Sequence, residues 1–104
     1  MTTQTRKTFY IGCNDKDTKL QGLSEHRIFT IITSVVNRYF TYGATIQKAT
    51  GTYRHENGEF VTENTFVVIV YSDAEHKQFV TEIKKSLNQE SVLVDIQKVQ
   101  LSFE

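Results

Sequence analysis

The sequence contains no proline, only one cysteine and no excess of either charge, and these absences exclude several classes of protein. Lys plus Arg and Asp plus Glu number 12 each, so no net field attracts a DNA or RNA polymer or an anionic membrane. Cys13 has no second cysteine with which to form a disulfide, which suits a reducing cytosol. No apolar run reaches the roughly 18 residues of a membrane helix, and no signal-peptide h-region follows Met1.

The length of 104 residues predicts a single domain that spans the whole chain, residues 1–104. No low-complexity linker and no internal repeat divides it. Residues 1–6 are polar, and we expect them to be flexible.

A strand and a helix are predicted in the first half of the chain. Residues 7–13 have the composition of a short buried strand. Ser24 is placed to cap a helix, with Leu23 packing on Ile28, and Gly43 is placed to end it. The apolar residues between them follow the spacing of one helix face: Ile28, Ile31, Ile32, Val35, Val36, Tyr39 and Phe40.

A hairpin, a second helix and a last strand follow. Strands at about 45–55 and 60–71 are joined at Asn57-Gly58, the strongest short hairpin signal. A two-residue turn there pairs position 54 with 61 and position 52 with 63. The segment Ser72-Asp73-Ala74-Glu75 reads as a capping box for the second helix. In the last strand the apolar alternation changes phase at Gln97-Lys98, which predicts a bulge or a bend.

This order of elements predicts an α+β fold of the ferredoxin-like type. Strand, helix, strand, strand, helix, strand (βαββαβ) gives a split βαβ sandwich, with one antiparallel sheet and two helices on one face. The other face of the sheet is left bare, and we expect a second subunit to cover its apolar side chains. The side chains assigned to that face are Tyr53, Phe60, Phe66 and Val68.

Polar residues gather where the first strand ends, in the segment Asn14 to Lys19. The topology places this segment at the same edge of the sheet as the hairpin turn. There Tyr53 can stack on a base, Arg54 can bind a phosphate and Asn64 can read a base or ribose edge. Two simpler interpretations stay open: Arg54 and Glu63 form a surface pair, and the aspartates of the segment cap turns.

No catalytic or metal site can be read from the sequence. As a calcium loop the segment fails, because Leu20 stands where glycine is needed and His26 where a glutamate is needed. His26, His55 and His76 share no metal-ligand spacing. No nucleophile lies near an identifiable base, and no cofactor motif is present.

Three blocks of sequence resemble a known family. These are Phe9 to Lys19, Gly51 to Gly58 and Glu63-Asn64-Thr65, which look like the phage-encoded Thoeris anti-defence sponges of the first type described. The resemblance runs from about residue 8 to residue 101, and its most specific part is the Asn-Asp-Lys-Asp-Thr-Lys block.

The resemblance implies a non-enzymatic, immune-evasion protein of the host cytoplasm that sequesters cyclic ADP-ribose messengers. Members assemble into homo-oligomers (a dimer, or a hexamer built from dimers), and some also hold cyclic oligonucleotides at a separate site. Combined with the polar residues above, it predicts no catalytic residue, no metal and no cofactor. The predicted ligand-binding residues are Asn14, Lys16, Thr18, Arg27, Arg38, Tyr53, Arg54 and Asn64.

Two alternatives from other classes stay open. One is a small enzyme acting on a nucleotide-like ligand, for which Asp15, Asp17 and Glu63 are the acids available. The other is an oligomeric regulatory or interaction module with no small ligand. Turnover separates the first from a sponge, because an enzyme returns altered product in excess of its own sites.

Overall fold

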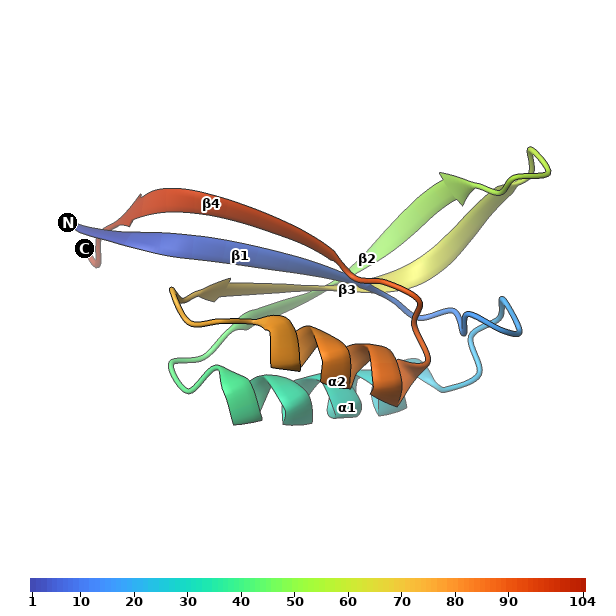
Figure 1. Ribbon diagram of the computed structural model, residues 1–104, viewed down its shortest axis with the longest axis horizontal. Coiled ribbons are helices and arrows are strands. Elements are labelled where there is room, and N and C mark those ends of the chain that lie inside the picture. The colour runs from blue at the N-terminus through green and yellow to red at the C-terminus, as the bar shows by residue number, and fades with distance from the viewer.

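The computed structural model describes residues 1–104 and shows a four-stranded antiparallel sheet with two helices on one face (Figure 1). The strands lie in the order β2-β3-β1-β4. The predicted βαββαβ fold is therefore confirmed. The elements are β1 (Thr2–Gly12), α1 (Glu25–Tyr39), β2 (Thr45–Arg54), β3 (Phe60–Tyr71), α2 (Lys77–Leu87) and β4 (Leu93–Leu101).

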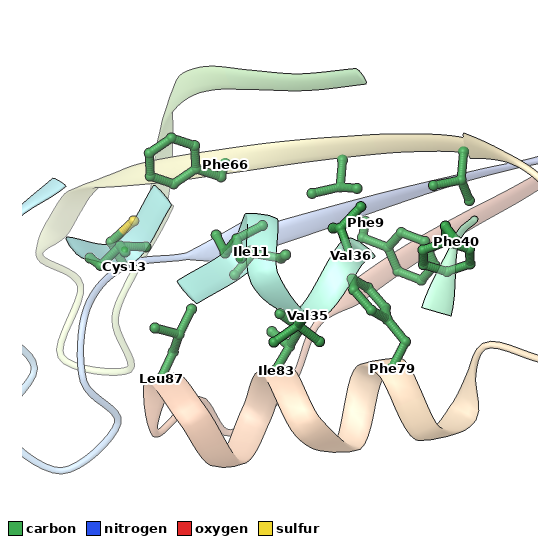
Figure 2. Packing of buried hydrophobic residues seen from close by; sticks show 14 residues of the cluster. Phe9, Ile11, Cys13, Val35, Val36, Phe40, Phe66, Phe79, Ile83 and Leu87 are labelled. Atoms are coloured by element: carbon green, nitrogen blue, oxygen red, sulfur yellow. The ribbon is translucent and has the colours of Figure 1, made fainter. Parts of the chain in front are cut away.

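The core lies between the helices and the sheet because apolar side chains of both layers alternate toward it. Phe9 and Ile11 of β1 are fully buried, and they meet Ile32 of α1 and Ile83 of α2, which are also fully buried. Phe79 packs edge-on against Phe9 with ring centroids 4.8 Å apart (Figure 2). Neither helix has the length and apolar character needed to cross a membrane.

Helix α1 begins as the sequence predicts, and α2 does not. The Ser24 hydroxyl accepts the Arg27 N–H at 3.1 Å, which is the predicted N-cap. In contrast, α2 starts only at Lys77, and its N-cap residue His76 makes no side-chain capping bond. Glu75 instead accepts the N–H groups of His76 and Lys77 at 2.9 and 3.0 Å, so the predicted capping box is a turn before the helix.

The first and last strands of the chain, β1 and β4, differ from prediction for one reason, which is that they pair with each other along their length. Strand β1 begins at Thr2, because Thr2 pairs with Leu101 of β4; the segment expected to be flexible is therefore mostly strand. The register between β1 and β4 runs without interruption from Leu101 to Leu93, so the predicted bulge is absent. The phase change moves the apolar side chains of β4 to the other face of the sheet instead.

The hairpin register is shifted by one residue from the prediction. Arg54 pairs with Phe60, and Gly51 pairs with Glu63. The turn has three residues between His55 and Glu59, whose N–H and C=O bond at 2.8 Å. Only Gly58 in it has a positive φ, of 88°, whereas a two-residue turn of the predicted kind needs two such residues.

Two of the side chains expected on the bare face of the sheet are buried in the core. Phe66 is 4% exposed and Val68 is fully buried, both under the helices. Tyr53 is 40% and Phe60 is 72% exposed, and they lie on opposite faces of the hairpin because their positions have opposite parity in the register. The four side chains therefore do not form one patch on the bare face, and the covering subunit stays a prediction.

Candidate functional site

A cleft of about 340 Å³ opens at the end of β1, between the segment 14–19, the β2-β3 hairpin and the α2-β4 connection. Figure 1 shows these three segments at the same end of the molecule, with the hairpin turned away from the helices. The volume falls within the ~300–1,000 Å³ usual for small-molecule sites. The cleft is lined by Asn14, Asp15, Lys16, Lys19, Tyr53, His55, Glu63, Gln89, Glu90 and Ser91.

The hairpin contributes an aromatic ring and a carboxylate from the same face. Tyr53 pairs with Val61, and Glu63 pairs with Gly51, so Tyr53 and Glu63 both project from the face opposite the helices. The imidazole of His55 lies edge-on to Tyr53, with centroids 5.4 Å apart.

Gly12 leaves the space that the Glu63 carboxylate occupies, and Gly51 leaves space for the neighbouring Thr65 hydroxyl. A Cβ added at Gly12 would lie 2.6 Å from Glu63 Oε1, closer than real Cβ atoms approach. A Cβ at Gly51 would lie 2.9 Å from the hydroxyl of Thr65, the neighbour of Glu63 on the same face. Glu63 Oε2 in turn accepts the Asn14 N–H at 3.0 Å. The carboxylate is thus fixed against the end of β1 by sterics and by one hydrogen bond.

The segment 14–19 is shaped by its own aspartate. Asp15 Oδ1 accepts the N–H groups of Asp17 and Thr18 at 2.8 and 3.1 Å, an Asx-type turn. The hydrogen bond from the Asn88 side chain, followed by these backbone bonds, lowers the pKa of the Asp15 carboxyl below 3.8. The turn-capping interpretation is therefore observed for Asp15, whose other oxygen faces Asn88.

Cys13 lies just behind the cleft and is 5% exposed. Burial, with a smaller contribution from the charge of Glu63, raises the pKa of its thiol from 9.0 to about 11. A thiol in this state is a poor nucleophile. Cys13 is therefore a small buried residue of the core.

The structure brings some of the predicted binding residues together and separates others. Asn14, Lys16 and Tyr53 line the cleft. Thr18 is in the adjacent turn, where its hydroxyl accepts the Leu20 N–H at 3.3 Å. Asn64 points to the helix face and donates to Gln21 Oε1 at 2.8 Å.

The three arginines do not line the cleft. Arg54 lies over the ring of Phe60, 4.5 Å from its centroid, on the opposite face of the hairpin from Tyr53. The predicted pairing of Arg54 with Glu63 is wrong because of the one-residue register shift. Arg38 forms an ion pair with Glu82 at 2.5 Å, and Arg27 lies in the first turn of α1.

Sequence reasoning missed the third wall of the cleft. Gln89, Glu90 and Ser91 lie between α2 and β4. The signal was available in the predicted topology, because β4 is antiparallel to β1 and must start where β1 ends. His55 and Lys19 also line the cleft, and the predicted set of ligand-binding residues omitted both.

Comparisons with known proteins find one family and two solved structures. Residues 6–103 match the family model described as protein of unknown function (DUF3574). The fold is shared with a phage SAM lyase in complex with S-methyl-5'-thioadenosine, at a TM-score of 0.63 and 19% identity, over 94% of this chain and 90% of that chain. The same lyase in its apo state gives a TM-score of 0.64 at 17% identity, over 98% and 93% of the two chains. No curated protein matches the sequence.

These findings contradict the identification with the Thoeris sponges. The family that matches is a different one, and the solved structures with this fold belong to a lyase. Two expectations that depended on this identification are therefore also wrong. They are a non-enzymatic protein, and cyclic ADP-ribose or cyclic oligonucleotides as its partners. The physical reason lies in the block that carried the resemblance: Asp15 and Thr18 serve the turn itself, so this pattern reports a loop conformation rather than a particular ligand.

Proposed function

The chain belongs to the DUF3574 family of proteins of unknown function, and we propose that it is an enzyme that cleaves S-adenosylmethionine to S-methyl-5'-thioadenosine. The observation that carries the proposal is the cleft at the end of β1, where Tyr53 and Glu63 project side by side from one face of the hairpin. The lyase with this fold that was solved with methylthioadenosine supports it. It corresponds to the enzyme alternative that the sequence left open.

The mixture of groups in the cleft suits the parts of this substrate. S-adenosylmethionine has a purine, a ribose, a sulfonium cation and an amino acid group. The ring of Tyr53 offers a stacking surface for the purine, and Asn14 and Lys16 offer donors for ribose hydroxyls. The carboxylates of Glu63, Asp15 and Glu90 favour a cationic ligand.

The cleavage balances without a second reactant. The bond between the sulfonium sulfur and Cγ of the amino acid arm breaks, and its electron pair stays on sulfur, which becomes the thioether of methylthioadenosine. The substrate's own carboxylate supplies a new pair to Cγ and closes a lactone. No proton is gained or lost in this step, so it does not require the nucleophile-plus-base arrangement that the sequence lacks.

The chain's contribution to such a step is orientation. Glu63 binds the substrate ammonium group, which keeps its charge through the reaction, and so holds the amino acid arm in the folded shape that brings carboxylate and Cγ together. Holding the reacting groups at contact distance lowers the barrier, because the entropic cost of bringing them together is paid on binding. Because Gly12 leaves room for the Glu63 carboxylate and the Asn14 N–H bonds to it, the carboxylate is preorganised for this task.

Product analysis tests the proposal. Purified protein is incubated with S-adenosylmethionine, and methylthioadenosine is quantified by chromatography over time. We expect product in molar excess over protein, and a loss of about 10- to 100-fold in Glu63→Gln, as for one hydrogen bond to a charged group. Glu59→Gln, an exposed carboxylate in the hairpin turn, is the matched control and keeps wild-type activity.

Other outcomes overturn the proposal. Cleavage is excluded if the substrate stays intact after prolonged incubation, or if methylthioadenosine forms no faster than without protein. The alternative of an interaction module without a small ligand then remains. The proposal includes the cytoplasm of a host cell as the place of action, since the solved enzyme with this fold is a phage protein.

A further inference from the structure

The segment 14–19 is tied to the end of α2 by two consecutive side chains. Asn88 Nδ2 donates to Asp15 Oδ2 at 3.0 Å and to Asp17 Oδ2 at 2.8 Å. Gln89 Nε2 donates to the Asn14 carbonyl at 2.5 Å. The backbone adds a fourth bond, from the Lys16 N–H to the Asn88 carbonyl at 3.0 Å. Every residue of the segment from 14 to 17 is therefore held by residue 88 or 89.

Asn88 reaches this position through an unusual backbone conformation. It is the C-cap of α2, in the left-handed region with φ 49° and ψ 54°. Its N–H donates to the Lys84 carbonyl, which closes the helix. Asparagine tolerates this region better than most residues, so one residue both ends α2 and turns its amide toward the segment 14–19.

The amide holds together two groups that repel each other. Oδ2 of Asp15 and Oδ2 of Asp17 lie within hydrogen-bond distance of the same nitrogen, so the two carboxylates are close neighbours. Like charges at such a separation repel, and a neutral amide with two N–H groups compensates without adding charge. The Asp17 N–H also bonds to Asp15 Oδ1 at 2.8 Å, but only the Asn88 amide bonds to the carboxylates of both aspartates.

We propose that Asn88 is a positioning residue for the cleft, which holds Asp15 and Lys16 in place as part of its wall. The effect on substrate rests on the proposed function, whereas the effect on the segment does not. Glu63 is held separately, because the Cys13 N–H bonds to the Asn64 carbonyl at 2.9 Å and keeps the start of the segment on the sheet. Loss of the amide should therefore weaken binding and spare the chemical step.

The test compares Asn88→Gly and Asn88→Asp with the wild type. Glycine accepts the left-handed conformation and keeps the Asn88 carbonyl, so Asn88→Gly removes only the two amide bonds. Asn88→Asp keeps the shape and places a third carboxylate beside two others. Asn37→Ala is the control, since it also removes an asparagine side chain, at an exposed position of α1 outside the cleft.

Two measurements separate this inference from the proposed function. Amide hydrogen exchange in the absence of ligand is expected to quicken about tenfold or more at residues 16–18 in Asn88→Gly, and further in Asn88→Asp. For methylthioadenosine formation, KM is expected to rise about tenfold while kcat changes less than about twofold. Asn37→Ala changes neither.

Each result has a fixed meaning. Unchanged exchange at residues 16–18 in Asn88→Gly overturns the positioning role, whatever the activity. If the wild type cleaves nothing, the proposed function fails, and faster exchange in the variants still supports the positioning role. A fall in kcat at constant KM contradicts the separation of binding from chemistry and overturns the inference as stated.

Discussion

The middle of the sheet and the rim at the end of β1 are built by different interactions. In the middle, Phe9, Ile32 and Ile83 are fully buried in one apolar layer, and no hydrogen bond specifies their contacts (Figure 2). At the rim, the segment 14–19 buries little apolar surface and is held by individual hydrogen bonds to Glu63, Asn88 and Gln89. The first region tolerates changes of detail, whereas the second depends on the placement of individual atoms.

This difference explains why one residue of register matters so much at the rim. In the core, a hydrophobic side chain of similar size still packs. In the hairpin, a shift of one residue exchanges the faces of one strand relative to the other, and it places Glu63 rather than Asn64 on the face of Tyr53. The chemical character of the cleft is therefore set by the three-residue turn at 56–58.

The largest effect on stability is expected from the core. Ile32→Ala removes a fully buried side chain that contacts both layers. The free energy of unfolding should fall by about 2–5 kcal/mol, measured by urea denaturation. Tyr42→Ala, at a side chain that is 100% exposed, is the control and should change it by less than about 0.5 kcal/mol. Similar losses in the two variants would contradict the assignment of the core.

Gly12→Ala is expected to damage the cleft while the core survives. The new Cβ would meet Glu63 Oε1 at 2.6 Å, so the carboxylate must leave its position. Methylthioadenosine formation should fall about 10- to 100-fold, as in Glu63→Gln. Gly22→Ala is the matched control, since nothing lies within 4 Å of its added Cβ. Full activity in Gly12→Ala would show that Glu63 need not be held there.

Lys16 lines the cleft, and Arg54 lies on the other face of the hairpin. Replacing each of these cations in turn therefore shows on which side the ligand binds. Lys16→Ala removes a cation that lines the cleft, and the Kd for methylthioadenosine, measured by calorimetry, should rise about 3- to 10-fold. Arg54→Ala removes a cation that lies over Phe60 on the other face, and the Kd should stay unchanged. The opposite ranking would place the ligand on the wrong side of the hairpin.

The smallest expected effect is the titration of Cys13 behind the cleft. Because folding raises the pKa of the thiol from 9.0 to about 11, this group stabilises the fold below pH 9 and loses that contribution as the pH rises toward 11. Thermal melts from pH 8 to 11 should show this loss, and Cys13→Ala should reduce it. Alkylation of native protein at pH 8 should be about 100-fold slower than that of an exposed thiol. Rapid alkylation would contradict the burial of the thiol.

The parts of the molecule that periodicity controls were predictable from the sequence. The apolar face of α1, its Ser24 cap and the two strands of the hairpin all follow from local patterns. The extension of β1 back to Thr2 was not, since Thr2 and Leu101 carry no local signal of their partnership. The prediction of a two-residue hairpin turn was wrong because Asn57-Gly58 suits two turn types, and only the structure shows which residue has a positive φ.

The meeting of the 14–19 segment with the hairpin at one rim was predictable from topology alone. Its chemistry was not, because a sequence block that caps its own turn resembled a ligand-binding motif. The third wall of the cleft consists of Gln89 to Ser91. Predicting it required use of the strand order, in which β4 lies beside β1.

The most direct test of the account is a hydrogen-exchange footprint of the protein with and without saturating methylthioadenosine. The account predicts slower exchange in residues 14–19, 53–55 and 89–91, which surround the cleft, and no change in residues 41–44 at the opposite end of the molecule (Figure 1). Protection confined to residues 41–44, or none at a ligand concentration that saturates binding, would contradict the claim that this cleft takes the nucleoside.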